Sequence, residues 1–430
     1  MGAGTEVSRN VVLLFALAVL LSAAALGLSR PGLIPGLEIG SGLVRAPDAD
    51  SESSSDDARS AWPAVRVLLG SAARPQHRLE IRGPYRLRVR GDWRVLAQGE
   101  RLDAATATVD DEGIRLGEDR FPHRELQIDV LESGALWLGG HRYHGDLQLL
   151  ADGDGQLRAI NLVDIESYVA SVVNGELPAD FPEAARQAQA IAARTYALYH
   201  MKSRRESQAF DLYDNTRSQV YGGIEYVADD GRRLAVETSS SRAIAEQTEG
   251  MVLVYDGRVI NSYYSAVCGG HTAAGLSIFA DAAPPLVGVA CEGCRDAPRY
   301  RWAVELPRAD VHARLTAYLD GIGQHLGEIR SVEALDAHDG RLPEVKIEGA
   351  KASHRISTAV LRRHVLRTRD LPSAFFSLRE QGELVHCEGR GWGHGVGMCQ
   401  WGARGMAAEG ATCPEILDHY YPGCQVRVVR

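Results

Sequence analysis

The sequence has no excess of positive charge. Its 430 residues include 47 Lys and Arg against 56 Asp and Glu, which gives a formal net charge of −9 and a pI of about 5.9. Nucleic-acid binding that depends on bulk electrostatics requires a basic surface, so this composition argues against that class of protein. We therefore expect no nucleic-acid partner.

The sequence also lacks the short motifs of several enzyme classes. It contains no G-x4-G-K-[ST] phosphate loop, no G-x-G-x-x-G, no G-x-S-x-G and no H-E-x-x-H. No cysteine has the local setting of a known thiol nucleophile. Acid–base chemistry at a carboxyl group is the enzymatic interpretation that remains.

Cysteine is absent from the first 267 residues. All seven cysteines lie in the C-terminal part, at positions 268, 291, 294, 387, 399, 413 and 424. In an exported protein disulfides are permitted, and an odd number leaves at least one thiol unpaired or in a metal site.

One long hydrophobic run is present near the N-terminus. Residues 11–29 carry no charge and lie between Arg9 and Arg30. This length spans a bilayer, so residues 1–30 predict a membrane anchor, with a cleaved signal segment as the alternative. We expect the body of the protein on the extracytoplasmic side of the cytoplasmic membrane, in the cell envelope.

The rest of the chain predicts an α+β fold. Residues 31–61 contain Pro, Gly, Ser and acids without core-forming residues, which predicts a disordered linker. Residues 62–160 show short strands between Gly and Asp breaks, which predicts a β-rich region. Residues 161–430 mix helices and strands and contain all the motifs described below.

Residues 164–201 predict two helices around an irregular joint. Gly175 is expected to end the first helix, Glu176 to follow it, and Pro182 to lie in the first turn of the second. The second helix is rich in alanine and carries Arg194. A carboxyl at such a joint can be partly desolvated and tuned for acid–base work, whereas the simpler interpretation is that Glu176 only caps a turn.

Two cysteine-containing pairs have the spacing of metal ligands. Cys268 and His271 are three residues apart, and Cys291 and Cys294 repeat that spacing about twenty residues later. The pattern predicts a structural zinc site of the Cys3His type, with disulfides as the alternative in an exported protein. Bridges between Cys413 and Cys424 and between Cys387 and Cys399 are further alternatives.

Glycine alternates with other residues from 389 to 397. In an extended strand one face would lack side chains, and the other would present Arg390, Trp392 and His394. A charge, an indole and an imidazole on one face suit carbohydrate binding, whereas a tightly packed central strand is the structural alternative. Earlier in the chain, Asp256-Gly257 between two apolar runs predicts a hairpin.

Four stretches in this order resemble the stage II sporulation protein D (SpoIID/LytB) family. They are ESYVASVVNGELPADFPEAARQAQAIAARTYAL (166–198), YYSAVCGGHT (263–272), GRGWGHGVGMCQWGARGMAAEG (389–410) and EILDHYYPG (415–423). The resemblance extends over about residues 62–430 and implies peptidoglycan binding and remodelling. Sporulation members are lytic transglycosylases of glycan strands without stem peptides, and other members are described as amidase enhancers.

The resemblance also implies roles for individual residues. Glu176 takes the position of the catalytic glutamate and Arg194 that of its supporting arginine. Family members have bound zinc near the motif that contains Cys268, with a different ligand set, and Cys399 stands where many relatives have serine. We expect substrate binding by these residues of the motifs: Tyr264, Ser265, Arg390, Trp392, His394 and Gln400.

Two functions follow as hypotheses. The first is a membrane-anchored lytic transglycosylase that cuts the bond between N-acetylmuramic acid and N-acetylglucosamine with a single Glu. The alternative is a non-catalytic peptidoglycan-binding protein that stimulates a cell-wall amidase. Expected partners are peptidoglycan glycan strands, such an amidase and, through the N-terminal helix, the membrane. Structural zinc is the expected cofactor.

Overall fold

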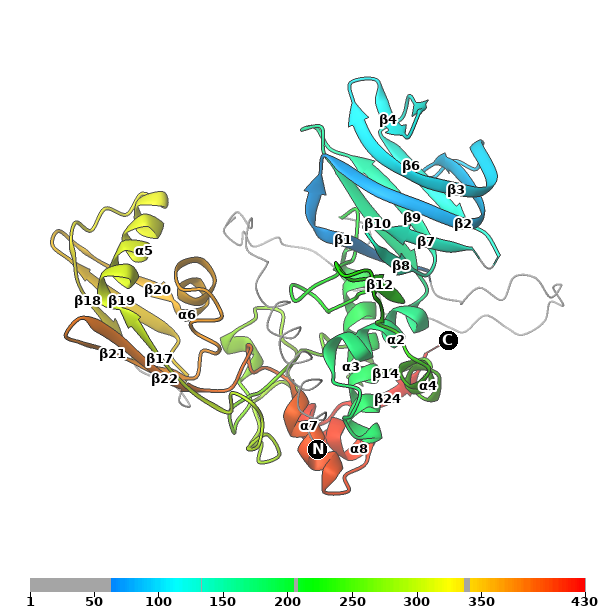
Figure 1. The fold of residues 1–430 in the computed structure, drawn as a ribbon. Helices are drawn as coiled ribbons and strands as arrows, with labels where there is room; N and C mark the ends of the chain where they lie inside the picture. The colour runs from blue at the N-terminus through cyan, green and yellow to red at the C-terminus, as the bar shows by residue number, and fades with distance from the viewer. Residues whose placement is uncertain (1–62, 133, 205–207, 336–340, 430) are drawn as a thin grey trace, which may run out of the picture.

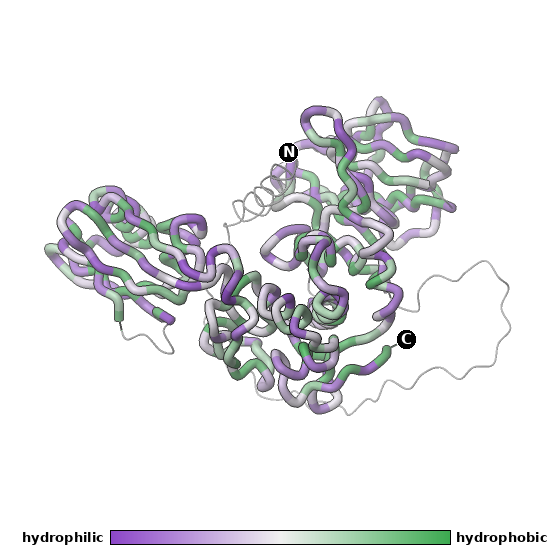
Figure 2. The backbone as a smooth tube through the Cα atoms, turned by 60° about the horizontal axis from the view of Figure 1, so that its bottom comes forward, coloured by the Kyte–Doolittle hydropathy of each residue, from purple (hydrophilic) through white to green (hydrophobic). Residues whose placement is uncertain are grey.

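The fold is α+β, as the sequence predicts. A computed structural model describes residues 63–132, 134–204, 208–335 and 341–429. Figure 1 shows a β-rich unit at the upper right, a helical centre below it and a separate lobe at the left. Figure 2 shows the same bodies from another side, each with apolar and polar segments interspersed.

The predicted membrane segment and linker, residues 1–30 and 31–61, lie outside the described residues. Within the described ranges no helix is both long enough and apolar enough to cross a membrane.

The N-terminal unit is built on one large sheet. Its strands alternate buried and exposed side chains or are continuously apolar, and most neighbours pair antiparallel. The first ten strands are β1 (Val65–Arg74), β2 (Gln76–Val89), β3 (Val95–Asp110), β4 (Gly113–Leu116), β5 (Asp119–Phe121), β6 (Glu125–Val130), β7 (Ala135–Leu138), β8 (His141–Tyr143), β9 (Asp146–Ala151) and β10 (Leu157–Val163).

This sheet is not complete within residues 62–160. Three later strands extend it, namely β11 (Leu212–Tyr213) beside β1, then β12 (Glu225–Val227) beside β8 and β13 (Arg233–Ala235) beside β12. The β-rich unit therefore depends on chain that follows the first two helices. Asp211 fastens this return, because its buried carboxylate accepts from Arg66 Nη2 at 2.6 Å and from the Arg66 backbone N–H at 3.0 Å.

Two helices lie under the sheet. Helix α2 (Ile165–Glu176) begins where β10 ends, because Asp164 caps it by accepting from the backbone N–H groups of Glu166 and Ser167. Its apolar face, which includes Tyr168 and Val172, joins the core of the sheet. Helix α3 (Glu183–Arg204) packs against α2, and its alanines are buried on both sides. Small side chains allow these close approaches.

Short elements complete the helical centre. Helix α4 (Ser239–Gln247) precedes β14 (Met251–Tyr255) and β15 (Arg258–Val259), which form the predicted hairpin at Asp256-Gly257. The rest of the predicted second strand separates as β16 (Tyr264–Ser265), which pairs in parallel with β23 (Met398–Cys399). The 3-10 helix η1 (Gly275–Ser277) follows, and the chain closes with α7 (Gln400–Ala408), α8 (Cys413–Tyr420) and β24 (Gln425–Val428) beside β14.

Residues 301–390 form the lobe, which has its own apolar core. Its two three-stranded sheets have the orders β17-β22-β21 and β18-β19-β20. The elements are β17 (Arg301–Pro307), α5 (Arg308–Gly321), β18 (Ile329–Ala334), β19 (Glu344–Gly349), β20 (Ser353–Ser357), α6 (Thr358–Val360), the π-helix η2 (Leu361–Val365), β21 (Phe376–Gln381) and β22 (Leu384–Arg390).

The glycine-alternating segment is not the continuous strand that the sequence predicts. Strand β22 ends at Arg390, and Gly391, Gly393, Gly395 and Gly397 all have positive φ values between 70° and 105°. Extended backbone requires negative φ, so this conformation excludes a strand with one bare face. At Gly397 a Cβ would overlap the Tyr263 carbonyl oxygen, so glycine here permits a close backbone approach.

Removing the Asp211 carboxylate is expected to destabilise the whole N-terminal unit. Asp211→Asn leaves the buried Arg66 guanidinium without its counter-ion, at a cost of about 3–5 kcal/mol in the free energy of unfolding. Chemical denaturation measures this loss. The matched control is Asp230→Asn, which removes an exposed carboxylate paired with Arg232 and should change stability little. Equal effects of the two variants would contradict the assignment.

Candidate active site

Glu176 is the last residue of α2 and the centre of the candidate site. Its Oε1 accepts from the Val220 backbone N–H at 2.8 Å, and its Oε2 accepts from Gln400 Nε2 at 3.2 Å. The hydroxyl of Tyr264 also hydrogen-bonds to the carboxyl. Three segments far apart in the sequence therefore converge on one acid that is only partly buried.

Gly175 makes this arrangement possible. The prediction that Gly175 ends the first helix is wrong. It lies inside α2, and a Cβ there would overlap the carbonyl oxygen of Val220. The absence of a side chain lets the segment around Val220 press against the helix. The same residue that needs this space donates its N–H to Glu176.

A second set of hydrogen bonds orients the donors. Gln219 Nε2 donates to the Tyr264 hydroxyl at 2.8 Å, and Gln219 Oε1 accepts from the Tyr168 hydroxyl at 2.8 Å. Because Tyr264 accepts from Gln219, its own hydrogen is free to point to Glu176. Gln400 is held in turn by Gln189, whose Oε1 lies 3.4 Å from Gln400 Nε2.

Helix α7 carries Gln400 to this position. Cys399 caps its N-terminus by accepting from the Gly402 backbone N–H, and the Trp401 ring packs edge-on against Phe181 in the joint between α2 and α3. The start of α7 is thus fixed against the loop that follows Glu176.

The partners of Glu176 are all neutral. Burial raises the pKa of the Glu176 carboxyl above 4.5, and the hydrogen bonds from Val220, Gln400 and Tyr264 only partly oppose this rise. A carboxyl that keeps its proton closer to neutral pH suits a general acid. If Glu176 only capped a turn, there would be no reason for three hydrogen-bond donors from separate segments to converge on its carboxyl group.

Arg194 does not hydrogen-bond to Glu176. Its guanidinium is buried and donates to both carboxylate oxygens of Glu166, at 2.9 and 2.5 Å, and to the Met251 and Ala245 carbonyls. It therefore fixes the first turn of α2 to α4 and β14. Any support of catalysis passes through the position of α2, and this role stays a prediction.

His394 is held as a neutral ring beside the site. Its Nδ1 accepts from the Val396 backbone N–H at 3.0 Å, and its ring packs edge-on against Phe279. Burial and the nearby Arg362 lower the pKa of His394 to about 4. A further hydrogen bond to the Tyr264 backbone links this ring to the segment that contacts Glu176.

Three predicted substrate residues remain, and each has a different setting. Ser265 is buried, and its hydroxyl has no hydrogen-bond partner among the described residues. Trp392 forms a bridge to Val267, and its indole lies under the Arg299 guanidinium. Arg390 lines a cavity with other arginines.

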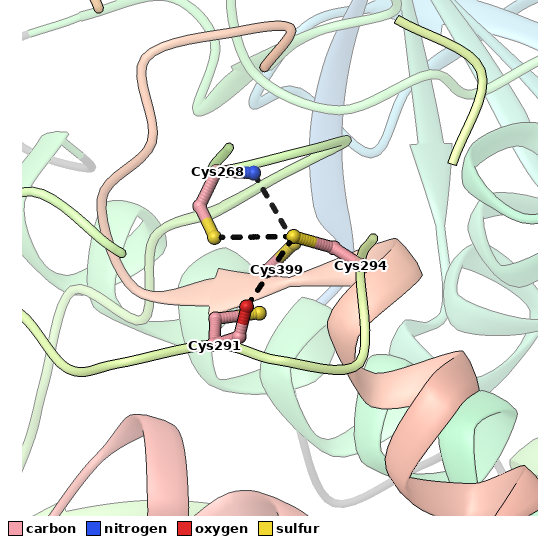
Figure 3. A group of neighbouring side chains, drawn as sticks. All are labelled: Cys268, Cys291, Cys294 and Cys399. Carbon is pink, nitrogen blue, oxygen red and sulfur yellow. Dashed lines mark hydrogen bonds between the residues drawn. The ribbon is translucent and has the colours of Figure 1, made fainter. Parts of the chain in front are cut away.

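The metal-ligand set predicted from spacing needs one correction. The Sγ atoms of Cys268, Cys291, Cys294 and Cys399 all lie within 4.8 Å of one another, and all four side chains are buried (Figure 3). His271 is not in this cluster, because its Nδ1 donates to the Thr272 carbonyl. The parallel pairing of β16 and β23 brings Cys399 to Cys268, a long-range contact that spacing could not reveal.

The four thiols form a donor set that can accommodate a metal ion. Cys268 Sγ and Cys294 Sγ are 3.7 Å apart, whereas a disulfide requires about 2.05 Å. A tetrahedral Zn–S distance of about 2.3 Å places sulfur atoms about 3.8 Å apart. The thiols of Cys268 and Cys291 hydrogen-bond to Cys294 and lower the pKa of its thiol, which favours one thiolate in the group.

Neighbouring polar groups stabilise this sulfur cluster. Cys399 Sγ accepts from the backbone N–H groups of Cys268 and Gly402, and the Tyr420 hydroxyl lies 3.1 Å from Cys291 Sγ. Such N–H···S bonds are typical of metal-binding thiolates. Gly402 is required here, since a Cβ would overlap both Tyr420 and Cys291.

No disulfide forms among the seven cysteines, which are all free. Cys387 lies in the core of the lobe and Cys399 in the sulfur cluster, so the predicted alternative bridge between them is wrong. The alternative bridge between Cys413 and Cys424 is likewise not formed.

Comparisons with known proteins identify the family. A profile described as stage II sporulation protein matches residues 153–255, and a domain of unknown function (DUF8618) matches residues 291–397. The chain is 30% identical over 279 residues to stage II sporulation protein D of Bacillus subtilis, which covers 63% of this chain and 76% of that protein. The chain belongs to the stage II sporulation protein D (SpoIID) family.

Two further relatives match this chain over different lengths. An uncharacterized protein of Brachyspira hyodysenteriae is 31% identical over 370 residues, or 84% of this chain and 92% of that protein. An amidase enhancer of Bacillus subtilis is 24% identical over 296 residues, or 59% of this chain and 39% of that protein.

Sequence reasoning missed Gln219, Val220 and Gln189. Gln219 and Val220 lie in a polar loop with interleaved aromatics that carries no recognisable motif. Gln189 lies among the alanines of α3 and is buried. A single amide within an alanine-rich helix was the only indication in the sequence.

Glu176→Gln is expected to raise the melting temperature at neutral pH and to change it little near pH 4. Below the unfolded-state pKa the carboxyl is neutral in both states. As the pH rises through the raised folded-state pKa, the wild type loses stability relative to the neutral amide. Thermal unfolding from about pH 4 to about pH 8 measures the difference.

The control for this experiment is Glu246→Gln, an exposed position on α4. Its melting temperature should follow the wild type at every pH. A difference between Glu176→Gln and wild type that does not grow with pH would show that Glu176 is not desolvated.

Proposed function

We propose that this protein remodels peptidoglycan as a lytic transglycosylase with Glu176 as its single acid and base. The observation that carries the proposal is a partly buried carboxyl of raised pKa, held by three neutral donors at the end of α2. Membership of the SpoIID family supports the cell-wall role.

The reaction balances with one carboxyl group. Glu176 protonates the glycosidic oxygen as the bond from C1 of N-acetylmuramic acid to N-acetylglucosamine breaks. The C6 hydroxyl of the same muramyl residue then attacks C1, and the Glu176 carboxylate takes its proton. The products are a free C4 hydroxyl and a 1,6-anhydro ring, and the acid is regenerated.

The surroundings of Glu176 fit both halves of this cycle. Burial raises the pKa of the Glu176 carboxyl, which favours the protonated form that the first step uses. The donors Val220, Gln400 and Tyr264 then stabilise the carboxylate that forms, because all three are already positioned to donate hydrogen bonds to it. Neither step requires a second carboxylate as a nucleophile.

The second candidate function is stimulation of a cell-wall amidase. The similarity to an amidase enhancer favours it, and a glycan-binding face would serve an enhancer as well as an enzyme. In this case the geometry at Glu176 would bind the glycan and leave it uncut.

We also propose that the sulfur cluster of Cys268, Cys291, Cys294 and Cys399 holds structural zinc. Four protein ligands leave no open position, so zinc would supply no Lewis-acid chemistry here. It would fasten the chain on both sides of the lobe to the start of α7, and thus to Gln400. The location we propose is the extracytoplasmic side of the cytoplasmic membrane, with residues 1–30 as the anchor.

The purified protein is expected to contain one zinc ion per chain. Cys399→Ser should lose most of it and melt at lower temperature, because a ligand is removed. His271→Ala should retain the metal, since His271 lies outside the cluster, and Cys424→Ser serves as the control cysteine. Metal analysis with thiol titration measures these outcomes, and a metal-free wild type with paired cysteines would contradict the proposal.

Glu176→Gln is expected to lower the cutting of peptide-free glycan strands by about 100- to 10,000-fold, the usual contribution of a general acid–base residue. Mass spectrometry of the digest measures 1,6-anhydromuramyl ends. Glu183→Gln, an exposed acid in the first turn of α3, is the matched control and should cut normally.

The two candidate functions give different results with the same proteins. If the wild type and Glu176→Gln produce equal background levels of anhydro ends, the transglycosylase proposal fails. If in addition both proteins bind glycan and raise the rate of a cell-wall amidase equally, the enhancer function is supported.

A further inference from the structure

An arginine-lined cavity lies where the lobe joins the helical centre. It has a volume of about 670 Å³ and is lined by Arg295, Ala297, Arg299, Tyr300, Arg301 and Arg390. No acidic side chain is among these residues. In a chain with a net charge of −9, such a concentration of positive charge requires an explanation.

Two of these arginines are neighbours on adjacent strands of the lobe. Arg301 on β17 and Arg390 on β22 are directly opposite in antiparallel register. Like charges in this position destabilise a sheet. Neither side chain has a carboxylate partner within the described residues, and only Arg295 in this cavity is in an ion pair, with Glu292.

The guanidinium groups are held by ring contacts that leave their N–H groups available. Arg299 lies over the Trp392 indole with its Cζ 4.8 Å from the ring centre, and Arg390 lies over Phe375 at 5.7 Å. Stacking fixes the plane of a guanidinium without using its donors. The cavity therefore presents preoriented donors to an anion.

The backbone beneath the cavity is strained. Arg299 has a φ of 66°, one of only three non-glycine residues with positive φ in the part of the chain that the structure describes. The Gly391 backbone N–H donates to the carbonyls of Arg299 and Tyr300, which maintains this conformation. A non-glycine residue in this conformation is strained, and such residues cluster at binding sites.

One short segment of chain connects the candidate active site to the residues beside the cavity. Tyr264, which contacts Glu176, is three residues from Val267, which pairs with Trp392. This separation is at most about 10 Å of extended chain. Recognition at both places requires a glycan strand bound at Glu176 to extend to Trp392 and Arg299.

We propose that this cavity binds carboxylate groups of peptidoglycan, and specifically the lactyl carboxylates of muramic acid in strands without stem peptides. The inference rests on the proposed function, in which a glycan strand is the ligand. Arginine forks bind carboxylates with two parallel hydrogen bonds. A stem peptide converts the lactyl carboxylate to a neutral amide, so the cavity would select strands from which the peptides have been removed.

This inference also gives a role to the region that matches a domain of unknown function. Residues 291–397 include all the residues that line the cavity, and this region begins at Cys291 of the sulfur cluster. The lobe would then recognise whether the glycan strand carries free lactyl carboxylates, while the helical centre cuts the strand.

The test measures binding by calorimetry in the Glu176→Gln background, so that no ligand is consumed. Three ligands of equal length are compared: peptide-free glycan, the same glycan with stem peptides, and chitin oligomers, which lack lactyl groups. We expect peptide-free glycan to bind at least about 10-fold more tightly than the other two, as charge-assisted hydrogen bonds imply.

Adding Arg301→Gln and Arg390→Gln should abolish this preference, so that peptide-free glycan binds no more tightly than chitin oligomers. The matched control is Arg379→Gln, an exposed arginine on β21 of the same sheet that does not line the cavity. Thermal unfolding verifies that each variant is folded.

Each other outcome overturns the inference in a distinguishable way. Equal binding of peptide-free glycan and chitin oligomers refutes the carboxylate site but leaves the glycan-binding function intact. Equal binding of glycan with and without stem peptides shows that the lactyl carboxylate is not the group recognised. Failure to bind any of the three refutes the proposed function itself.

Discussion

The structure depends on shielding one carboxyl group from much of the solvent without giving it a charged partner. Glu176 ends a helix whose last turn is covered by Val220, Tyr264 and Gln400, and each of these donors comes from a different part of the chain. A nearby arginine or lysine would stabilise the carboxylate and lower its pKa. Instead, the buried Arg194 of α3 is paired with Glu166 at the other end of α2, and the buried Arg186 donates to Asn174 and Ser240.

The sulfur cluster and the candidate active site share one structural element. Cys399 caps α7 and joins the cluster, and the next residue, Gln400, donates to Glu176. Disorder at the cluster would therefore be transmitted to the acid within a single peptide unit. This adjacency gives four cysteines from three separate segments a structural route to the candidate acid.

The sequence was sufficient for local features. The Asp256-Gly257 turn and the placement of Glu176 at the joint of two helices both follow from short-range patterns. Residues whose roles arise from tertiary pairing could not be found in this way. Cys399 joins Cys268 only because β16 and β23 run side by side, and Arg194 turns away from Glu176 because Glu166 offers it a bidentate partner. The glycine pattern misled, since alternation has the period of a strand while positive φ values are invisible in composition.

The lobe enters and leaves the rest of the chain at adjacent points, because its first and last strands pair so that Arg301 lies opposite Arg390. Chain ends that meet in this way make an insertion topologically neutral for its host. The lobe can lengthen, shrink or be exchanged during evolution without moving the helices that hold Glu176. The proposed preference for one form of cell wall can thus evolve separately from the proposed capacity to cut it.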